Sequence, residues 1–114
     1  MNSASIANDD VMIRDLRDDP AYAVEYLRAA LEDGDEPAVL MIALRHVMDA
    51  YGGVSKLAEA AGIRPEVLYR ALSLKGDLTM RTFLAVIKAL GMKIEISRQP
   101  HAHAELEQFS VQSR

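Results

Sequence analysis

The sequence predicts an all-α fold of five helices followed by one short C-terminal strand. Three observations support this prediction. Apolar residues recur every three or four positions through most of residues 19–90, which is the spacing of amphipathic helices. Residues that start or end helices, such as Asp-Pro pairs, Thr and Gly, divide that pattern into segments. After Gly91 the apolar and polar residues alternate, which is typical of a strand.

Composition limits the classes of protein to be considered. A chain of 114 residues, with 50% hydrophobic and 26% charged residues, is expected to form one globular domain. The absence of cysteine excludes disulfides, thiolate zinc sites and cysteine nucleophiles. The longest apolar run, residues 38–44, is much shorter than the ~20 residues of a membrane span. Residues 1–10 lack a basic start before an apolar core, so we expect a cytoplasmic protein with no membrane partner.

The first helix is predicted to begin at Asp19-Pro20, where the carboxylate caps the helix and proline suits the first position. Its inward stripe consists of Ala23, Leu27, Ala30 and Leu31. Residues 1–14 show no periodicity and are expected to form a flexible N-terminal arm. A single helical domain is therefore expected over residues 15–97, with residues 98–114 as a flexible C-terminal tail.

A second helix is predicted to run from Pro37 to about Ala50. It begins with the same kind of signal, because Asp35 and Glu36 precede the proline. Its stripe consists of Leu40, Leu44, Val47 and Met48, but its first half is apolar nearly all round. A helix of that kind is usually central in the core or covered by a second subunit.

Residues 53–73 meet the requirements of a helix-turn-helix, in which two short helices cross closely after a tight turn. The two helices are predicted over residues 54–61 and 65–74. Ala58 supplies the small side chain at the crossing, and Gly62 supplies the positive φ of the turn. Ile63 follows as an apolar plug. An ordinary helical hairpin is the alternative, and the outward face of the second helix argues against it.

The second helix of this motif presents a partly basic face, provided that Leu68, Ala71 and Leu72 are buried. In a helix-turn-helix the second helix lies in the major groove of DNA. We expect arginine there to bind guanine, and tyrosine to reach a phosphate or a thymine methyl. The predicted base-reading residues are Arg64, Pro65, Glu66, Tyr69, Arg70 and Ser73. The predicted phosphate contacts are Ser55, Lys56, Lys75 and Arg81.

A fifth helix is predicted from Thr79, which caps it, to Gly91, which closes it. Its apolar face consists of Met80, Phe83, Leu84, Ile87 and Leu90. The strand predicted over residues 92–97 has no second strand to pair with, and one strand cannot satisfy its own backbone. We therefore expect it to pair with its own copy in a homodimer, through Ile94 and Ile96.

Charge divides the chain into two parts, although its net charge is only −4. Residues 1–36 contain three basic and ten acidic side chains, whereas residues 37–98 contain nine basic and five acidic ones. A basic region binds phosphate by local neutralisation, whatever charge the rest of the chain carries. The acidic part is suited to a basic protein partner. The alternative is that both parts are merely solvated faces.

Several segments together resemble one known family, over about residues 15–97. They are Asp19-Pro20-Ala21-Tyr22-Ala23, Ala43-Leu44-Arg45, Gly52-Gly53, Leu57-Ala58, Gly62-Ile63, Leu68-Tyr69-Arg70-Ala71-Leu72-Ser73 and Ile87-Lys88-Ala89-Leu90-Gly91. In these the sequence resembles the addiction-module antidote family, HigA-type antitoxins with an Xre-like, lambda-repressor-like helix-turn-helix. The resemblance implies a dimer that binds double-stranded operator DNA, represses its own operon and neutralises a small basic toxin of the RelE/ParE kind. The candidate toxin-binding residues are Asp18, Asp19, Glu25 and Glu32.

No catalytic, cofactor or metal site is predicted. His46 is expected to be an ordinary helix residue, and His101 and His103 lack a third ligand nearby. The sequence contains no phosphate-binding glycine loop and no recognisable pair of nucleophile and base, so an enzyme is not expected. Two alternatives stay open: an Xre-type transcriptional regulator without a toxin, and a helical protein-interaction module that has lost DNA binding.

Overall fold

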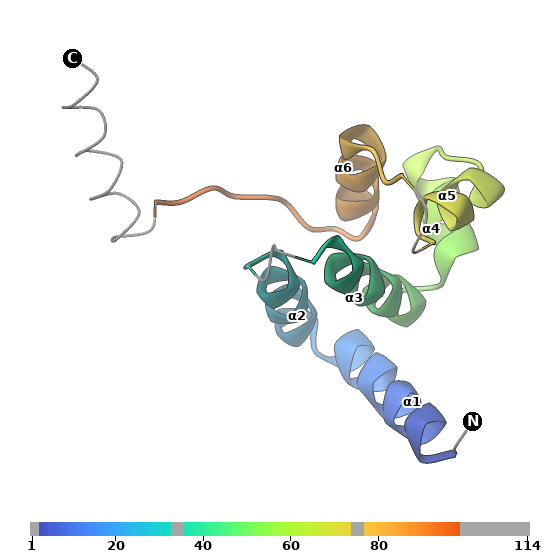
Figure 1. Cartoon of the computed structure of the whole chain (residues 1–114), viewed down its shortest axis with the longest axis vertical. Coiled ribbons are helices and arrows are strands. Elements are labelled where there is room, and N and C mark those ends of the chain that lie inside the picture. Colours follow the sequence, from blue (N-terminus) through green and yellow to red (C-terminus); the bar gives the residue numbers. More distant parts are fainter. Residues whose placement is uncertain (1–2, 33–35, 74–76, 99–114) are drawn as a thin grey trace.

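The computed structural model of the chain describes residues 3–32, 36–73 and 77–98, which form six helices and no strand (Figure 1). The helices are α1 (Ser3–Asp18), α2 (Pro20–Glu32), α3 (Pro37–Ala50), α4 (Val54–Ala61), α5 (Pro65–Ala71) and α6 (Met80–Ala89). The prediction of an all-α fold is confirmed, but the described residues form six helices and not five. None of the helices within the described residues is long and apolar enough to cross a membrane.

Helix α3 is the centre of the molecule, since it contacts α1, α2 and α4 (Figure 1). Leu44, Val47 and Met48 on its inner face are fully buried, as their helical spacing predicted. Its first half is only partly covered, because Val39 is 38% and Ile42 is 48% exposed. The prediction of a central helix is therefore right for its inner stripe, while two of its apolar side chains reach the surface.

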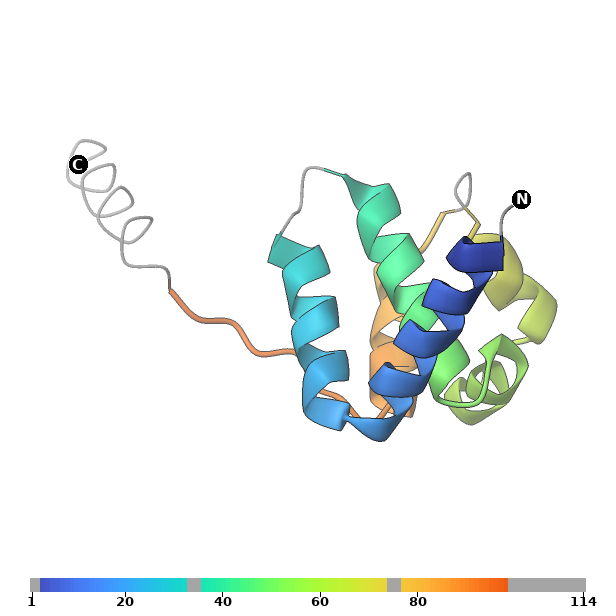
Figure 2. The ribbon, with the colours of Figure 1, turned by 90° about the horizontal axis from the view of Figure 1, so that it is seen from below.

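Helices α1 and α2 cover one side of α3 (Figure 2). Leu16 of α1 and Ala23 of α2 are fully buried in the core shared with α3. Polar contacts add to this packing. The Tyr51 hydroxyl donates a hydrogen bond to the Leu16 carbonyl at 3.0 Å. The Tyr26 hydroxyl lies 2.7 Å from Nδ1 of His46, so it joins α2 to α3.

The expectation of an arm without structure over residues 1–14 is wrong from residue 3 onward, because these residues belong to α1. The stripe of buried apolar residues in α1 is short. Met12 and Ile13 pack against the core beside fully buried Leu16, and charged residues surround them. A stripe of little more than one turn is too short to show helical periodicity in the sequence.

Helix starts and ends agree well with the predictions. Asp19 Oδ1 accepts a hydrogen bond from the Tyr22 N–H at 3.2 Å, so the predicted cap of α2 is confirmed. Thr79 Oγ1 accepts from the Thr82 N–H at 3.1 Å at the start of α6. Helix α5 is shorter than predicted, because it ends at Ala71.

The strand predicted over residues 92–97 is not present. The Met92 N–H donates to the Ile87 carbonyl at 3.0 Å, which closes α6, and the chain then runs away from the helices in an extended form (Figures 1 and 2). Ile94 and Ile96 are 44% and 95% exposed in this segment. A strand requires a hydrogen-bonded neighbour, and none of the described residues of the chain supplies one.

Candidate functional site

The unit formed by α4 and α5 has the local geometry that the sequence predicted. Gly62 adopts a left-handed φ of 72°, which only glycine adopts without strain. The Ile63 N–H then donates to the Ala58 carbonyl at 2.8 Å, so the turn closes α4 and the chain reverses toward α5. Ala58 is fully buried, as expected of a small residue where two helices approach closely.

The rotation of α5 about its axis decides which residues face solvent. Leu68, Ala71 and Leu72 are buried, at 0%, 8% and 5% exposure, so the predicted inner face is confirmed. With this face turned inward, the other positions of α5 face solvent. The exposed residues at α5 and its two ends include all six predicted base-reading residues, Arg64, Pro65, Glu66, Tyr69, Arg70 and Ser73.

Several of these exposed residues contact one another. Arg64 Nε lies 3.4 Å from Glu66 Oε1, and both side chains remain mostly exposed, so this ion pair contributes little to stability. The Ser73 hydroxyl donates to the Arg70 carbonyl at 2.9 Å, and therefore caps the end of α5. At the other end Arg64, whose side chain has no acceptor, makes no side-chain cap hydrogen bond.

The predicted phosphate contacts lie at the starts of two helices. Ser55 and Lys56 are exposed in the first turn of α4, and Arg81 is exposed in the first turn of α6. The alkyl chain of Lys56 passes close to Gly52, because a Cβ on that glycine would lie 2.7 Å from Lys56 Cδ. Lys75 lies outside the described residues.

The predicted toxin-binding residues are all exposed on α1 and α2 or between them. Asp18 pairs with Arg17 at 3.3 Å and Glu25 with Arg28 at 2.6 Å, each within its own helix. Asp19 caps α2 and Glu32 ends it, so these carboxylates belong to the opposite part of the molecule from α5 (Figure 1). The candidate toxin-binding carboxylates and the predicted base-reading residues thus lie on or beside different helices.

Comparison with known families identifies a relationship over most of the chain. Residues 8–98 match the family model described as "Probable addiction module antidote protein". The chain belongs to this family. The predicted resemblance is confirmed at the level of the antidote family, whose description implies a toxin partner. The comparison with curated proteins finds no match, and the comparison with solved structures finds none either.

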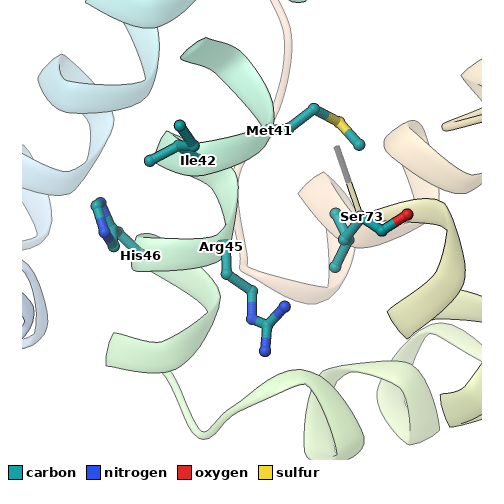
Figure 3. A pocket seen from close by; sticks show the side chains of 6 residues that line it. Met41, Ile42, Arg45, His46 and Ser73 are labelled. Carbon is teal, nitrogen blue, oxygen red and sulfur yellow. The ribbon is translucent and has the colours of Figure 1, made fainter. Parts of the chain in front are cut away.

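The antidote also has a shallow groove that the sequence did not predict, between α3 and the end of α5 (Figure 3). Its volume is about 280 Å³, and it is lined by Met41, Ile42, Arg45, His46, Leu72 and Ser73. The lining is mainly apolar. Figure 3 shows Met41 and Arg45 on the side of α3 that faces Ser73, whereas Ile42 and His46 lie on the other side of the helix. Within the described part of the antidote, no cluster of three or more His, Cys, Asp or Glu side chains could hold a metal ion.

Arg45 is the residue at this site that the sequence analysis did not single out. Its guanidinium carbon lies 5.3 Å from the centre of the Tyr69 ring, so α3 of the antidote contacts the outward side of α5. The sequence offers only a weak indication that Arg45 belongs to the site. Arg45 is the one charged side chain in the first ten residues of α3. Its position in the sequence alone does not indicate which helix it faces.

Proposed function

We propose that this antidote is a sequence-specific DNA-binding antitoxin, which neutralises a RelE/ParE-like toxin in the cytoplasm and represses its own operon. Family membership supports the antitoxin role. The DNA-binding role is supported by one observation above all: α5 buries its inner face and directs Arg64, Tyr69 and Arg70 outward at a tight two-helix turn. A second helix held in this way can enter the major groove and present arginines to guanine.

The neutralising role is assigned to the acidic surface of α1 and α2. Toxins that attack RNA need a basic surface, and exposed carboxylates on these helices complement such a partner. Glu25 and Glu32 are two helical turns apart in α2, so they lie on the same side of that helix. Asp18 and Asp19 lie at the junction with α1. Toxin and DNA then use different surfaces of the antidote.

We further propose that the antidote acts as a homodimer, with Ile94 and Ile96 at the contact between copies. These isoleucines lie on an extended segment that leaves unpaired backbone and apolar side chains exposed, and a second copy of the segment would cover both. Two copies of α5 would then read two half-sites of one operator. An antidote that is monomeric in sedimentation experiments at micromolar concentration would contradict this proposal.

DNA binding by the full chain is the direct test. A labelled duplex from upstream of the gene is titrated with the antidote at fixed salt, against a scrambled duplex of the same length. We expect tighter binding to the upstream duplex. The toxin role is tested separately, by co-expressing the antidote with the product of the adjacent reading frame and measuring growth and co-purification. Growth arrest that the antidote does not relieve would contradict the neutralising role.

A second candidate function is a protein-interaction module that has lost DNA binding. The exposed side chains of Val39 and Ile42 on α3 favour it, because a helical adaptor needs an apolar surface of this kind. Equal binding to the upstream and scrambled duplexes, or none to either, would favour the interaction module over the repressor. A regulator without a toxin would show the opposite combination: sequence-dependent DNA binding and no toxic partner.

A further inference from the structure

Arg45 lies on α3, outside the two-helix unit, yet its side chain reaches the surface beside α5. Its guanidinium stacks on Tyr69, with 5.3 Å between the guanidinium carbon and the ring centre. The Arg45 side chain is 41% exposed and the Tyr69 residue is 45% exposed. An arginine on an aromatic face keeps its hydrogen-bond donors at the rim, where an anion can reach them.

Within the described residues, Arg45 forms one long ion pair, and its Nε makes no hydrogen bond. The nearest carboxylate oxygen, Asp49 Oδ1, is 3.7 Å from Arg45 Nε, which is too long for a hydrogen bond. The Nε atom is buried and makes no hydrogen bond to any described residue. Met41 and Leu72 line the groove beside it and offer no acceptor in their side chains. The contact with Tyr69 therefore holds the Arg45 side chain in place, while the long ion pair with Asp49 neutralises its charge only weakly.

The position of Tyr69 on α5 indicates which part of a bound DNA duplex would lie next to Arg45. At about 100° per residue, Glu66 and Arg70 mark the centre of the outward face, and Tyr69 lies about 80° to one side of it. A helix about 10–12 Å wide nearly fills a major groove about 12 Å wide. The centre of such a helix faces the base edges, and its sides face the two sugar-phosphate strands. Arg45 lies on one of these sides.

We propose that Arg45 binds a backbone phosphate of DNA, and that Tyr69 is the platform that positions its guanidinium. This inference rests on the proposed DNA-binding function and extends the interface from α4 and α5 onto α3. The stacking on Tyr69 holds the guanidinium in place before DNA arrives. Asp49 competes weakly for the same charge.

Binding measured as a function of salt distinguishes a phosphate contact from a base contact. Arg45→Gln and the native chain are titrated with the upstream and the scrambled duplex between about 50 and 200 mM salt, a range over which phosphate contacts change affinity strongly. We expect Arg45→Gln to weaken binding to the upstream and the scrambled duplex by a similar factor. The slope of log K against log salt should fall in magnitude by about one. Arg28→Gln is the control, because it removes an exposed arginine with a carboxylate neighbour from α2, which lies far from α5 (Figure 1).

Three further variants separate the effects of charge, stacking and folding. Asp49→Asn keeps Arg45 and removes the competing carboxylate, so both duplexes should bind more tightly. Tyr69→Leu should reduce the slope as Arg45→Gln does, whereas Tyr69→Phe should not, because it keeps the ring. Thermal unfolding of each variant is measured in parallel. If Arg45→Gln does not fold, Asp49→Asn alone decides the matter, and unchanged affinity in that variant overturns the proposal.

The outcomes also separate this inference from the function on which it rests. If the native chain binds DNA with a steep salt dependence and Arg45→Gln retains the slope, the phosphate role is wrong while the DNA-binding function stands. Loss of discrimination between the duplexes at an unchanged slope would make Arg45 a base-reading residue and overturn the proposal. Reduced toxin binding with unchanged DNA binding would assign Arg45 to the toxin surface and also overturn it. If the native chain binds neither duplex, both the function and the inference fail.

Discussion

Leu68 provides the sharpest test of how α5 is oriented, because every statement about the outward face depends on this side chain pointing inward. Leu68 is fully buried, whereas its neighbour Val67 is 41% exposed on the same helix. Leu68→Ala removes three buried carbon groups, which at about 0.8 kcal/mol each amounts to about 2.4 kcal/mol. The cavity left behind raises the expected loss in the free energy of unfolding to about 3–4 kcal/mol.

Val67→Ala is the matched control on the same turn of α5. It shortens a partly exposed side chain, so we expect a change of at most about 0.5 kcal/mol. Urea unfolding followed by circular dichroism measures both variants, with similar slopes against denaturant if the unfolded states are alike. If Val67→Ala costs as much as Leu68→Ala, then α5 is rotated from the orientation described above. Arg70 would no longer face outward, and the assignment of the base-reading residues would fail.

Three further predictions concern the site and the turns that hold it. Arg70→Ala should weaken binding to the upstream duplex and lower discrimination against base changes by about 1–3 kcal/mol; an unchanged dissociation constant at matched salt would contradict its role. Gly62→Ala should cost about 1–2 kcal/mol in unfolding free energy because φ is 72° there, and Gly62→Asn should cost less since asparagine tolerates that conformation; equal losses would refute the backbone argument. Thr79→Ala should cost about 1 kcal/mol through loss of the cap of α6, whereas Thr79→Ser, which keeps the hydroxyl, should behave nearly as the native chain in thermal unfolding.

Local chemistry made most of the helices predictable. Asp19 and Thr79 cap helices through hydrogen bonds within one turn, so the sequence alone is enough to place them. The turn at Gly62 is local in the same sense, since it depends on a single positive φ. Helix α1 was missed for the opposite reason: the burial of Leu16 depends on α2 and α3, which no local pattern reports. The predicted strand failed likewise, because alternation in residues 92–97 predicts an extended chain but not a neighbour to pair with.

In the candidate site, too, features that depend on local sequence could be predicted, and features that depend on packing between helices could not. The inward and outward residues of α5 follow from helical periodicity, so Leu68 and Arg70 could be assigned from the sequence. The contact between Arg45 and Tyr69 joins residues 24 positions apart on different helices, and only the packing of α3 against this part of the molecule brings them together. Met80 and Leu84 were expected inside and are 68% and 48% exposed, because α6 packs mainly against α4 and buries a narrower face than the full apolar stripe.

The central place of α3 has a genetic consequence. Because this helix supports the acidic helices on one side and the α4–α5 unit on the other, replacing Leu44 or Val47 with a polar residue should abolish the two proposed activities, toxin protection and operon repression, together. Lesions that abolish only one of the two activities should fall on exposed positions, of α2 for protection and of α5 for repression. In a screen of random mutants that scores both phenotypes, double-negative alleles would cluster on the inner face of α3, and the two single-negative classes would complement each other when co-expressed, because each copy keeps the surface that the other has lost.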